Sequence, residues 1–250
     1  MYIGGIKIGS TVADIGGNWM FTTSAQSDGT KLISAVQTDV AGNVSPASPP
    51  YSVTIDTQVA PPSIEGVLND TGVQGDSITA DNTLQVNGKA EPGATVEVKI
   101  NGTSVGTTIA DANGDWRFTT AAQSDGPKSI TAAQTDIAGN VSGPSAAFGI
   151  TIDTQVAAPT IESVGDDTGQ SNTDRVTADN TLDIRGKAEA GASVDVRIDG
   201  VSVGTAIADI NGNWRLTTTA QNDGVKSITA TQTDVAGNVS QPSVPYSMTI

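Results

Sequence analysis

The chain has 250 residues, 27 of them acidic and 12 basic, and its formal net charge of −15 repels nucleic acids and anionic membrane surfaces while it attracts cations. It contains neither histidine nor cysteine, which removes the commonest general base, the commonest transition-metal ligands and the thiol nucleophile. This composition argues against zinc, haem and iron–sulfur chemistry and against a nucleic-acid partner, and no apolar run is long enough for insertion into a membrane.

A long internal repeat organises the chain. Trp19, Trp116 and Trp214 recur at a period close to one hundred residues, and each is followed by an alternating run and then by one closing phrase. That phrase occupies residues 37–45 and returns at 134–142 and 232–240 with a single Ile/Val change. The period is too long for a solenoid unit and has the size of an independent small domain.

The self-alignment also predicts the domain boundaries. It places Met1 opposite Val98, which lies in the middle of a predicted strand of the second copy. The first copy therefore has no counterpart of residues 56–97. We predict the C-terminal half of a repeat over residues 1–55 and complete repeats over 56–152 and 153–250, taken from a longer array.

Within the second copy the local pattern is that of β-strands. Apolar residues alternate with polar ones on short segments bounded by Gly, Asn, Asp and Pro, which is typical of strands with one buried face. No apolar stripe with a helical period persists, so we expect no helix. In chain order the predicted strands cover 64–68, 84–88, 96–100, 105–109, 116–118, 130–132 and 148–152. Seven strands joined by tight turns such as Asn101-Gly102 predict an all-β fold: tandem immunoglobulin-like seven-stranded sandwiches in a rod-like array.

Acidic residues fall at both poles of this predicted sandwich. The loops after strands two, four and six share a pole with the start of strand one, which we call the head pole. Its acids are Asp56, Glu91, Asp111 and Asp136 in the second copy and Asp153, Glu189, Asp209 and Asp234 in the third. The opposite pole, here the foot pole, carries Asp70 in the second copy and Asp167 in the third. Acids at the foot of one repeat would therefore face acids at the head of the next.

Such a joint repels itself unless a cation intervenes. Calcium binds about 6 to 8 oxygen atoms from Asp, Glu, Asn and backbone carbonyls in adaptable geometry, so we expect Ca²⁺ at the joints. The competing interpretation is that Asp and Asn are turn-forming residues. The segment 111–115 has its glycine at the wrong place for an EF-hand and alone indicates a hairpin. Glutamate is a poor turn former, and Glu91 therefore favours calcium.

Four motifs in order resemble the bacterial Ig-like repeats of giant Bap-like surface adhesins, which are biofilm-associated and type I secreted. They are Ile-Asp-Thr-Gln-Val-Ala-Pro from Ile55, Gly-Lys-Ala-Glu-Pro-Gly-Ala from Gly88, Ala-Asp-Ala-Asn-Gly-Asp-Trp from Ala110 and Thr-Asp-Ile-Ala-Gly-Asn-Val-Ser from Thr135. The resemblance implies an extracellular or cell-surface location, an extender role, and calcium at the joints between neighbouring repeats. In the third copy Ala190 replaces the proline but the carboxylate of Glu189 remains.

We therefore expect a non-enzymatic stalk segment of a cell-surface adhesin, a calcium-stiffened rod that supports cell adhesion and biofilm formation. Its partners would be the neighbouring repeats, while other regions would contact a host or biofilm surface. The alternative is a module that recognises a glycan or host receptor through its loop poles. An exposed aromatic patch would favour that alternative, although alternation places Trp116 and Trp214 in the core. A carboxylate hydrolase would need one copy to carry a cleft that the others lack.

Overall fold

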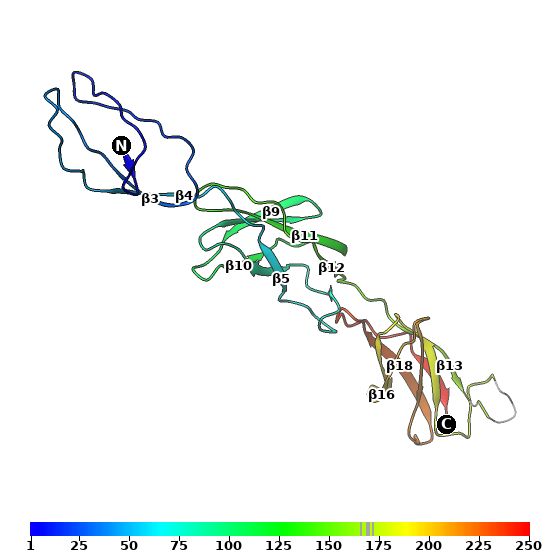
Figure 1. Ribbon diagram of the computed structural model, residues 1–250. Coiled ribbons are helices and arrows are strands. Elements are labelled where there is room, and N and C mark those ends of the chain that lie inside the picture. Colours follow the sequence, from blue (N-terminus) through cyan, green and yellow to red (C-terminus); the bar gives the residue numbers. More distant parts are fainter. Residues whose placement is uncertain (166, 169–170, 172) are drawn as a thin grey trace.

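The computed structural model describes residues 1–165, 167–168, 171 and 173–250. Figure 1 shows three β-rich bodies that follow one another along a single line, with the N-terminal body at one end. We call them repeat one (residues 1–55), repeat two (56–152) and repeat three (153–250). None of the described residues lies in a helix, so no helix there could cross a membrane.

Repeat two is a sandwich of two sheets. Its strands are β5 (Ser63–Val67), β6 (Ile78–Thr79), β7 (Gln85–Lys89), β8 (Thr95–Ile100), β9 (Thr103–Ile109), β10 (Asp115–Thr119), β11 (Gly126–Thr135) and β12 (Phe148–Ile152). One sheet has the order β10-β7-β5 and the other β6-β12-β11-β8-β9. The seven predicted strands are confirmed. The added strand β6 pairs in parallel with β12 over two residues, which is too short to show an alternating pattern.

Repeat three repeats this topology. Its strands are β13 (Thr160–Gly165), β14 (Asp183–Lys187), β15 (Ser193–Ile198), β16 (Val201–Ile207), β17 (Asn213–Thr217), β18 (Val225–Thr233) and β19 (Tyr246–Thr249). The sheets have the orders β13-β14-β17 and β16-β15-β18-β19. In the place of β6, Val176 forms one parallel bridge with Thr249.

Each complete repeat has its own core, formed by the inward side chains of the two sheets. In repeat two, Leu84 and Val86 face Val98 and Ile130, and all four are fully buried. The polar residues between them point to solvent, as the alternation predicts. Burial of apolar area, at roughly 25 cal/mol per Å², is the main stabilising contribution for such a sandwich.

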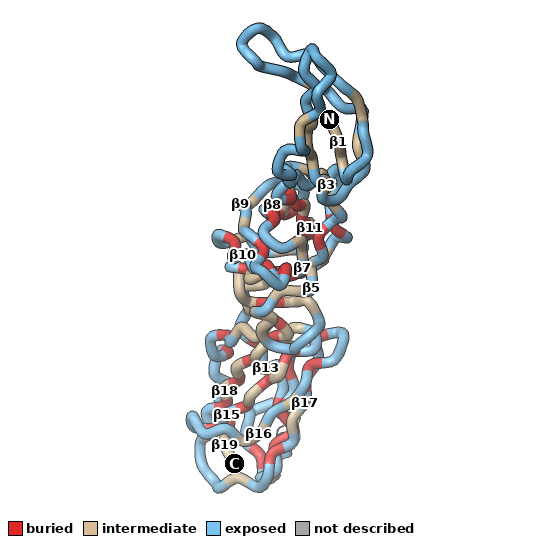
Figure 2. Tube along the Cα trace, turned by 60° about the vertical axis from the view of Figure 1, so that its left-hand side comes forward, coloured by how far each residue is buried: buried red, intermediate tan, exposed pale blue. Residues whose placement is uncertain are grey.

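Repeat one contains a single sheet. Its strands β1 (Tyr2–Ile3), β2 (Ile6–Lys7), β3 (Gly29–Ser34) and β4 (Tyr51–Ile55) have the order β2-β1-β3-β4. No residue of 1–55 is buried, whereas buried residues run through both complete repeats (Figure 2). Trp19 is 51% exposed, compared with 3% for Trp116 and Trp214. Residues 1–55 form only the one sheet, and no second sheet packs over the Trp19 side chain as one does over Trp116 and Trp214.

Candidate functional site at the joint between repeats

The head pole of each complete repeat is held to its linker by a buried glutamine. In repeat two the Gln134 side chain is 2% exposed; its Nε2 donates to the Ala60 carbonyl (2.6 Å) and its Oε1 accepts from the Glu91 amide (2.8 Å). Gln232 makes the same pair of bonds in repeat three, to Ala157 (2.7 Å) and Glu189 (2.8 Å). The glutamine thus joins the linker, the β7–β8 turn and β11 in one fixed arrangement.

An aspartate–asparagine pair adds a second tie. The Asn140 amide and side chain donate to the two carboxylate oxygens of Asp136, at 2.8 and 2.7 Å, and Asn140 Nδ2 also donates to the carbonyl of Asp56 (3.1 Å). The side-chain bond from Asn140 lowers the pKa of the buried Asp136 carboxyl below its ordinary value. In repeat three Asn238 links Asp234 and the Asp153 carbonyl, at 2.8 Å each. The pair therefore fixes the path of the chain as it enters a repeat.

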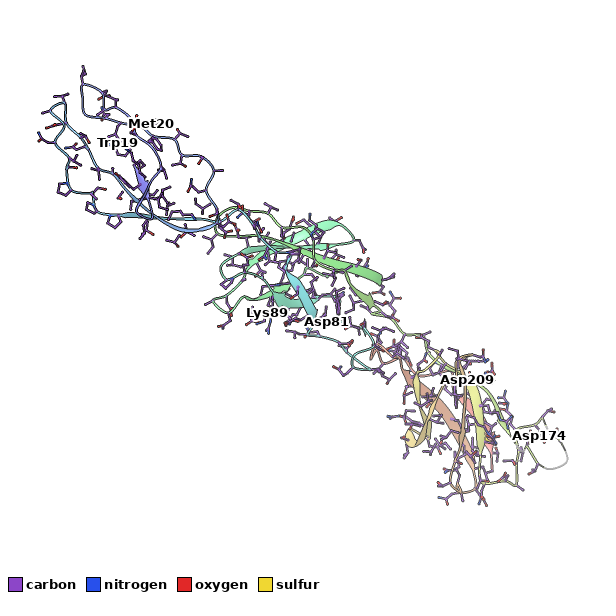
Figure 3. All side chains as sticks on the ribbon, viewed as in Figure 1. Trp19, Met20, Asp81, Lys89, Asp174 and Asp209 are labelled. Carbon is purple, nitrogen blue, oxygen red and sulfur yellow. The ribbon has the colours of Figure 1, made fainter. Side chains whose placement is uncertain are left out.

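The remaining head-pole carboxylates accept local hydrogen bonds. Asp111 Oδ1 accepts from the amides of Asn113 (2.8 Å) and Asp115 (2.9 Å), and Asp209 does the same in repeat three. Asp56 and Asp153 accept from the amides of Gln58 (3.3 Å) and Gln155 (3.2 Å). These bonds are those of turn-forming aspartates. Figure 3 shows Asp209 at the end of repeat three that faces repeat two, and Asp174 toward the other end.

The glutamate of the head pole binds the linker. Glu91 Oε1 accepts from the Ala60 amide (3.4 Å), and Glu189 Oε1 accepts from the Ala157 amide (3.0 Å). A glutamate at this position therefore has a structural reason besides metal binding, which sequence reasoning did not find. Across the part of the chain that the structure describes, no three Asp or Glu side chains come together as a metal-binding group.

The foot-pole aspartates differ from those at the head pole. One oxygen of Asp70 accepts from the Gly75 amide (2.6 Å), and one oxygen of Asp167 accepts from the Arg175 amide (3.0 Å). The other oxygen, Oδ1 in both residues, is buried and has no hydrogen-bond partner among the described residues. A buried carboxylate oxygen without a donor is costly, so this atom is a candidate ligand for a cation.

The joint between repeats two and three is closed by the loop that follows β5. Thr71 Oγ1 donates a hydrogen bond to the carbonyl oxygen of Ala236 (2.6 Å), and the Val73 amide donates one to the carbonyl oxygen of Val235 (3.0 Å). Between them Gly72 has a φ of 69°, and a Cβ atom there would lie 2.2 Å from the Val235 carbonyl oxygen. Only glycine fits, so the backbones of the two repeats are in direct contact. We call residues 71–73 the donor loop and residues 235–237 the receiving loop.

The hydroxyl group of the donor loop is oriented by its own repeat. Thr71 Oγ1 accepts from the Ala80 amide (2.6 Å) and lies 3.1 Å from Oγ1 of the fully buried Thr79. Thr71 Oγ1 accepts the hydrogen bond from the Ala80 amide and donates its own proton to the carbonyl oxygen of Ala236. In repeat three Thr168 Oγ1 likewise accepts from the Ala178 amide (2.9 Å) and lies 3.1 Å from Thr177 Oγ1. Bonds within each repeat therefore orient the threonine hydroxyl group before it contacts another repeat.

The linker threonine makes the remaining tie across each joint. Thr154 Oγ1 donates to the carboxylate of Asp125 at the foot of repeat two (2.9 and 3.1 Å), and Thr57 Oγ1 donates to Asp28 of repeat one (2.9 Å). The recurring Ile-Asp-Thr-Gln motif is therefore the covalent joint itself. Its threonine binds the repeat before it, and its aspartate carbonyl binds the repeat after it.

The family model of the bacterial Ig-like domain matches the chain three times, over residues 1–57, 58–154 and 155–250. The chain belongs to this family. The matched segments of these bacterial Ig-like repeats meet two residues after the boundaries predicted from the sequence. A search of curated proteins finds no match.

Several solved structures are similar to these bacterial Ig-like repeats. The BSP domain of a biofilm-associated protein is 23% identical, with a TM-score of 0.28, over 69% of this chain and 28% of its own. The fibronectin(III)-like modules of Clostridium thermocellum CbhA are 16% identical, with a TM-score of 0.40, over 74% of this chain and 93% of theirs. The D0-D1 domain of intimin is 14% identical, with a TM-score of 0.28, over 74% and 98%. The chain thus spans well under two thirds of the biofilm-associated structure.

Proposed function

We propose that the chain is an extender segment of a bacterial cell-surface adhesin, whose repeats act as spacers that hold a distal binding region away from the cell. The observation that carries the proposal is the contact of the donor loop with the receiving loop. Two hydrogen bonds and a backbone contact at Gly72 fix the direction of repeat three relative to repeat two. A flexible linker would leave that direction free.

The energy of this contact is modest. Each hydrogen bond contributes a net of about 0.5 to 1.5 kcal/mol, so the joint sets an orientation rather than adding a large share of stability. The linker ties from Thr154 and Asn238 act in the same region and supplement it. A spacer needs this property, because its length depends on the alignment of successive domains.

Small-angle X-ray scattering of the full chain tests the proposal. The native chain should give the profile of an extended particle, and Gly72→Val should give a broader distribution of interdomain distances with both folds retained. Gly149→Val is the matched control, because a Cβ at Gly149 meets no atom within 4 Å. A compact native particle, or a Gly72→Val profile identical to the native one, would contradict the spacer role.

Calcium stiffening belongs to this proposal. Its support is the buried, unpartnered Oδ1 atom of Asp70 and of Asp167, found at the foot pole of both complete repeats. Asp70 lies two residues before Gly72 of the donor loop. Ca²⁺ would supply the positive charge that this oxygen needs and would order the loop that carries the joint.

The location follows from the same proposal. A chain without cysteine or disulfides suits export in the unfolded state, and calcium outside the cell would complete its folding. We therefore place the segment on the bacterial surface, with neighbouring repeats as its direct partners.

The geometry gives less support to the two alternative functions, a carboxylate hydrolase and a receptor-binding module. In both complete repeats a shallow depression lies beside the buried tryptophan, lined by Asp111, Asp115 and Arg117 in repeat two and by Asp209, Asn213 and Arg215 in repeat three. Because it recurs, it does not distinguish one copy as an enzyme would. The exposed aromatic residues Trp19 and Tyr51 belong to repeat one, which has one sheet and no buried residue. We accordingly propose neither a hydrolase nor a receptor-binding module.

A further inference from the structure

Repeat two contains a second copy of the receiving loop. Residues 134–142 and 232–240 are identical except that Ile137 replaces Val235. The turns also have the same backbone bonds: the Gly139 amide donates to the Asp136 carbonyl as the Gly237 amide does to Asp234, both at 3.2 Å. The Asp136–Asn140 pair braces the one loop as Asp234–Asn238 braces the other. Residues 137–139 therefore have the shape of a receiving loop.

The two loops differ in what covers them. Ala236 is fully buried under the donor loop of repeat two, whereas the corresponding Ala138 is exposed and Ile137 is 83% exposed. Residues 1–55, which lie next to this end of repeat two, contain no Asp-Thr-Gly segment. The receiving surface of repeat two is formed but open.

The single substitution leaves the receiving atoms unchanged. A Cβ built on Gly93 would lie 3.0 Å from Cδ1 of Ile137, and one built on Gly191 would lie 3.2 Å from Cγ1 of Val235. Both side chains therefore rest on the glycine of their own β-turn, within their own repeat. The additional methylene of isoleucine extends over this turn, and the two backbone carbonyls remain available.

We propose that residues 137–139 are a docking site for the donor loop of another complete repeat, of sequence Asp-Thr-Gly-Val, on the N-terminal side of repeat two. The threonine hydroxyl would donate to the Ala138 carbonyl, and the valine amide to the Ile137 carbonyl, with the glycine between them against Gly139. The inference rests on the spacer function proposed above and extends it.

The partner is thus a second unit of the same kind. Each complete repeat has a receiving loop at its head pole, and Thr168 of repeat three is oriented as Thr71 is. Such a heterologous, head-to-tail contact repeats without closing, which is the geometry of a linear array.

The first test uses Val235→Ile in the full chain, which makes the receiving loop of repeat three identical to that of repeat two over nine residues. Hydrogen exchange of the Val73 amide reports the joint. We expect the variant to exchange as slowly as the native chain, whereas Gly72→Val exchanges roughly tenfold faster or more. Fast exchange in Val235→Ile would overturn the proposal, because the loop of repeat two could then not receive a donor loop.

The second test adds a copy of residues 58–97 before Met1, which supplies repeat one with the missing strands and a donor loop. Trp19 should become as inaccessible to acrylamide as Trp116, and the added valine amide should become as protected as that of Val73. A buried Trp19 with an unprotected added amide would overturn the proposal. If Trp19 stays accessible, the added strands have not completed repeat one. The exchange rate of the Val73 amide in Val235→Ile then decides whether the proposal holds. The Val73 amide in the same sample reports the joint between repeats two and three. If it stays protected while the added amide does not, the docking proposal fails and the spacer function does not.

Discussion

Trp116 lies across Gly88 of β7, so that a Cβ atom on this glycine would be 2.8 Å from Cζ2 of the indole and 1.9 Å from the Ser63 carbonyl oxygen. Gly186 has the same relation to Trp214 and to Thr160, at 2.7 and 1.8 Å. Neither glycine has a positive φ, so the close approach of the first strand and the indole is what requires glycine. The tryptophan of each core can therefore occupy its place only when the central strand has glycine beside it.

Replacing Gly186 by alanine should therefore destabilise repeat three by about 3 kcal/mol or more, because backbone atoms of β13 have to move. Urea unfolding of the full chain measures the effect, with repeat two as an internal reference. Gly149→Ala should change stability little, since its Cβ meets open space. If repeat three of Gly186→Ala unfolds at the same urea midpoint as in the native chain, β13 moves without a loss of stability.

Replacing Gln232 by alanine should loosen the entry to repeat three. The change removes the partner of the carbonyl of the exposed Ala157 and of the amide of the half-buried Glu189, and each lost hydrogen bond costs about 0.5 to 1.5 kcal/mol. Thermal unfolding of the full chain should show a lower midpoint for repeat three alone. The control is Gln241→Ala at an exposed position. Equal midpoints in the two variants would mean that water replaces the glutamine.

Sequence patterns predicted the sandwich well, because successive side chains of a strand point to opposite faces, so that alternate apolar residues are those that enter the core. The seven strands of repeat two were identified from alternate apolar positions such as Val96 and Val98, and both lie in the core. The gathering of acidic loops at one pole also follows from the strand order. Strand β6 was missed, because a two-residue parallel pairing has no period.

The contacts at the joint could not be predicted in the same way. Thr71 and Ala236 are 165 positions apart, and their contact depends on how two folded domains meet. The recurrence of Asp-Thr-Gly at Asp70 and Asp167 was a visible signal, but it reads equally well as a turn. Likewise, the pattern identified Glu91 as unusual without indicating that the Ala60 amide is its partner.

Acid should destabilise the chain through its hydrogen-bonded aspartates. Hydrogen bonds from the Asn140 side chain and amide lower the pKa of Asp136 below its ordinary value, and those from Asn43 do the same for Asp39. A group whose pKa is depressed by folding stabilises the protein above its unfolded pKa and loses that contribution as pH falls through the folded value. Asp136→Asn should therefore be less stable than native at pH 7, and the difference should shrink as the pH falls through the lowered pKa of Asp136. Urea unfolding across pH measures both, and a difference that is constant with pH would contradict this assignment.

Repeat one should exchange its amide hydrogens far faster than the two complete repeats. None of its residues is buried, and the apolar face of its one sheet, including Leu32, is open to solvent. An open face of this kind also favours pairing with another chain. Hydrogen exchange by mass spectrometry compares residues 1–55 with residues 58–250, and sedimentation establishes the oligomeric state. Equal protection in a monomer would show that repeat one is stabilised in some other way.

Calcium should stabilise the chain through Asp70 and Asp167, whose buried Oδ1 atoms lack a donor among the described residues. At a free concentration ten times the dissociation constant, one site adds about 1.4 kcal/mol to the free energy of unfolding. Thermal unfolding in millimolar calcium should therefore have a higher midpoint than in chelator, and Asp70→Asn should reduce that difference. Asp223→Asn removes the same charge at an exposed position, and magnesium controls for charge screening. Identical midpoints with calcium and with chelator would mean that water satisfies Asp70 and that hydrogen bonds alone orient the joint.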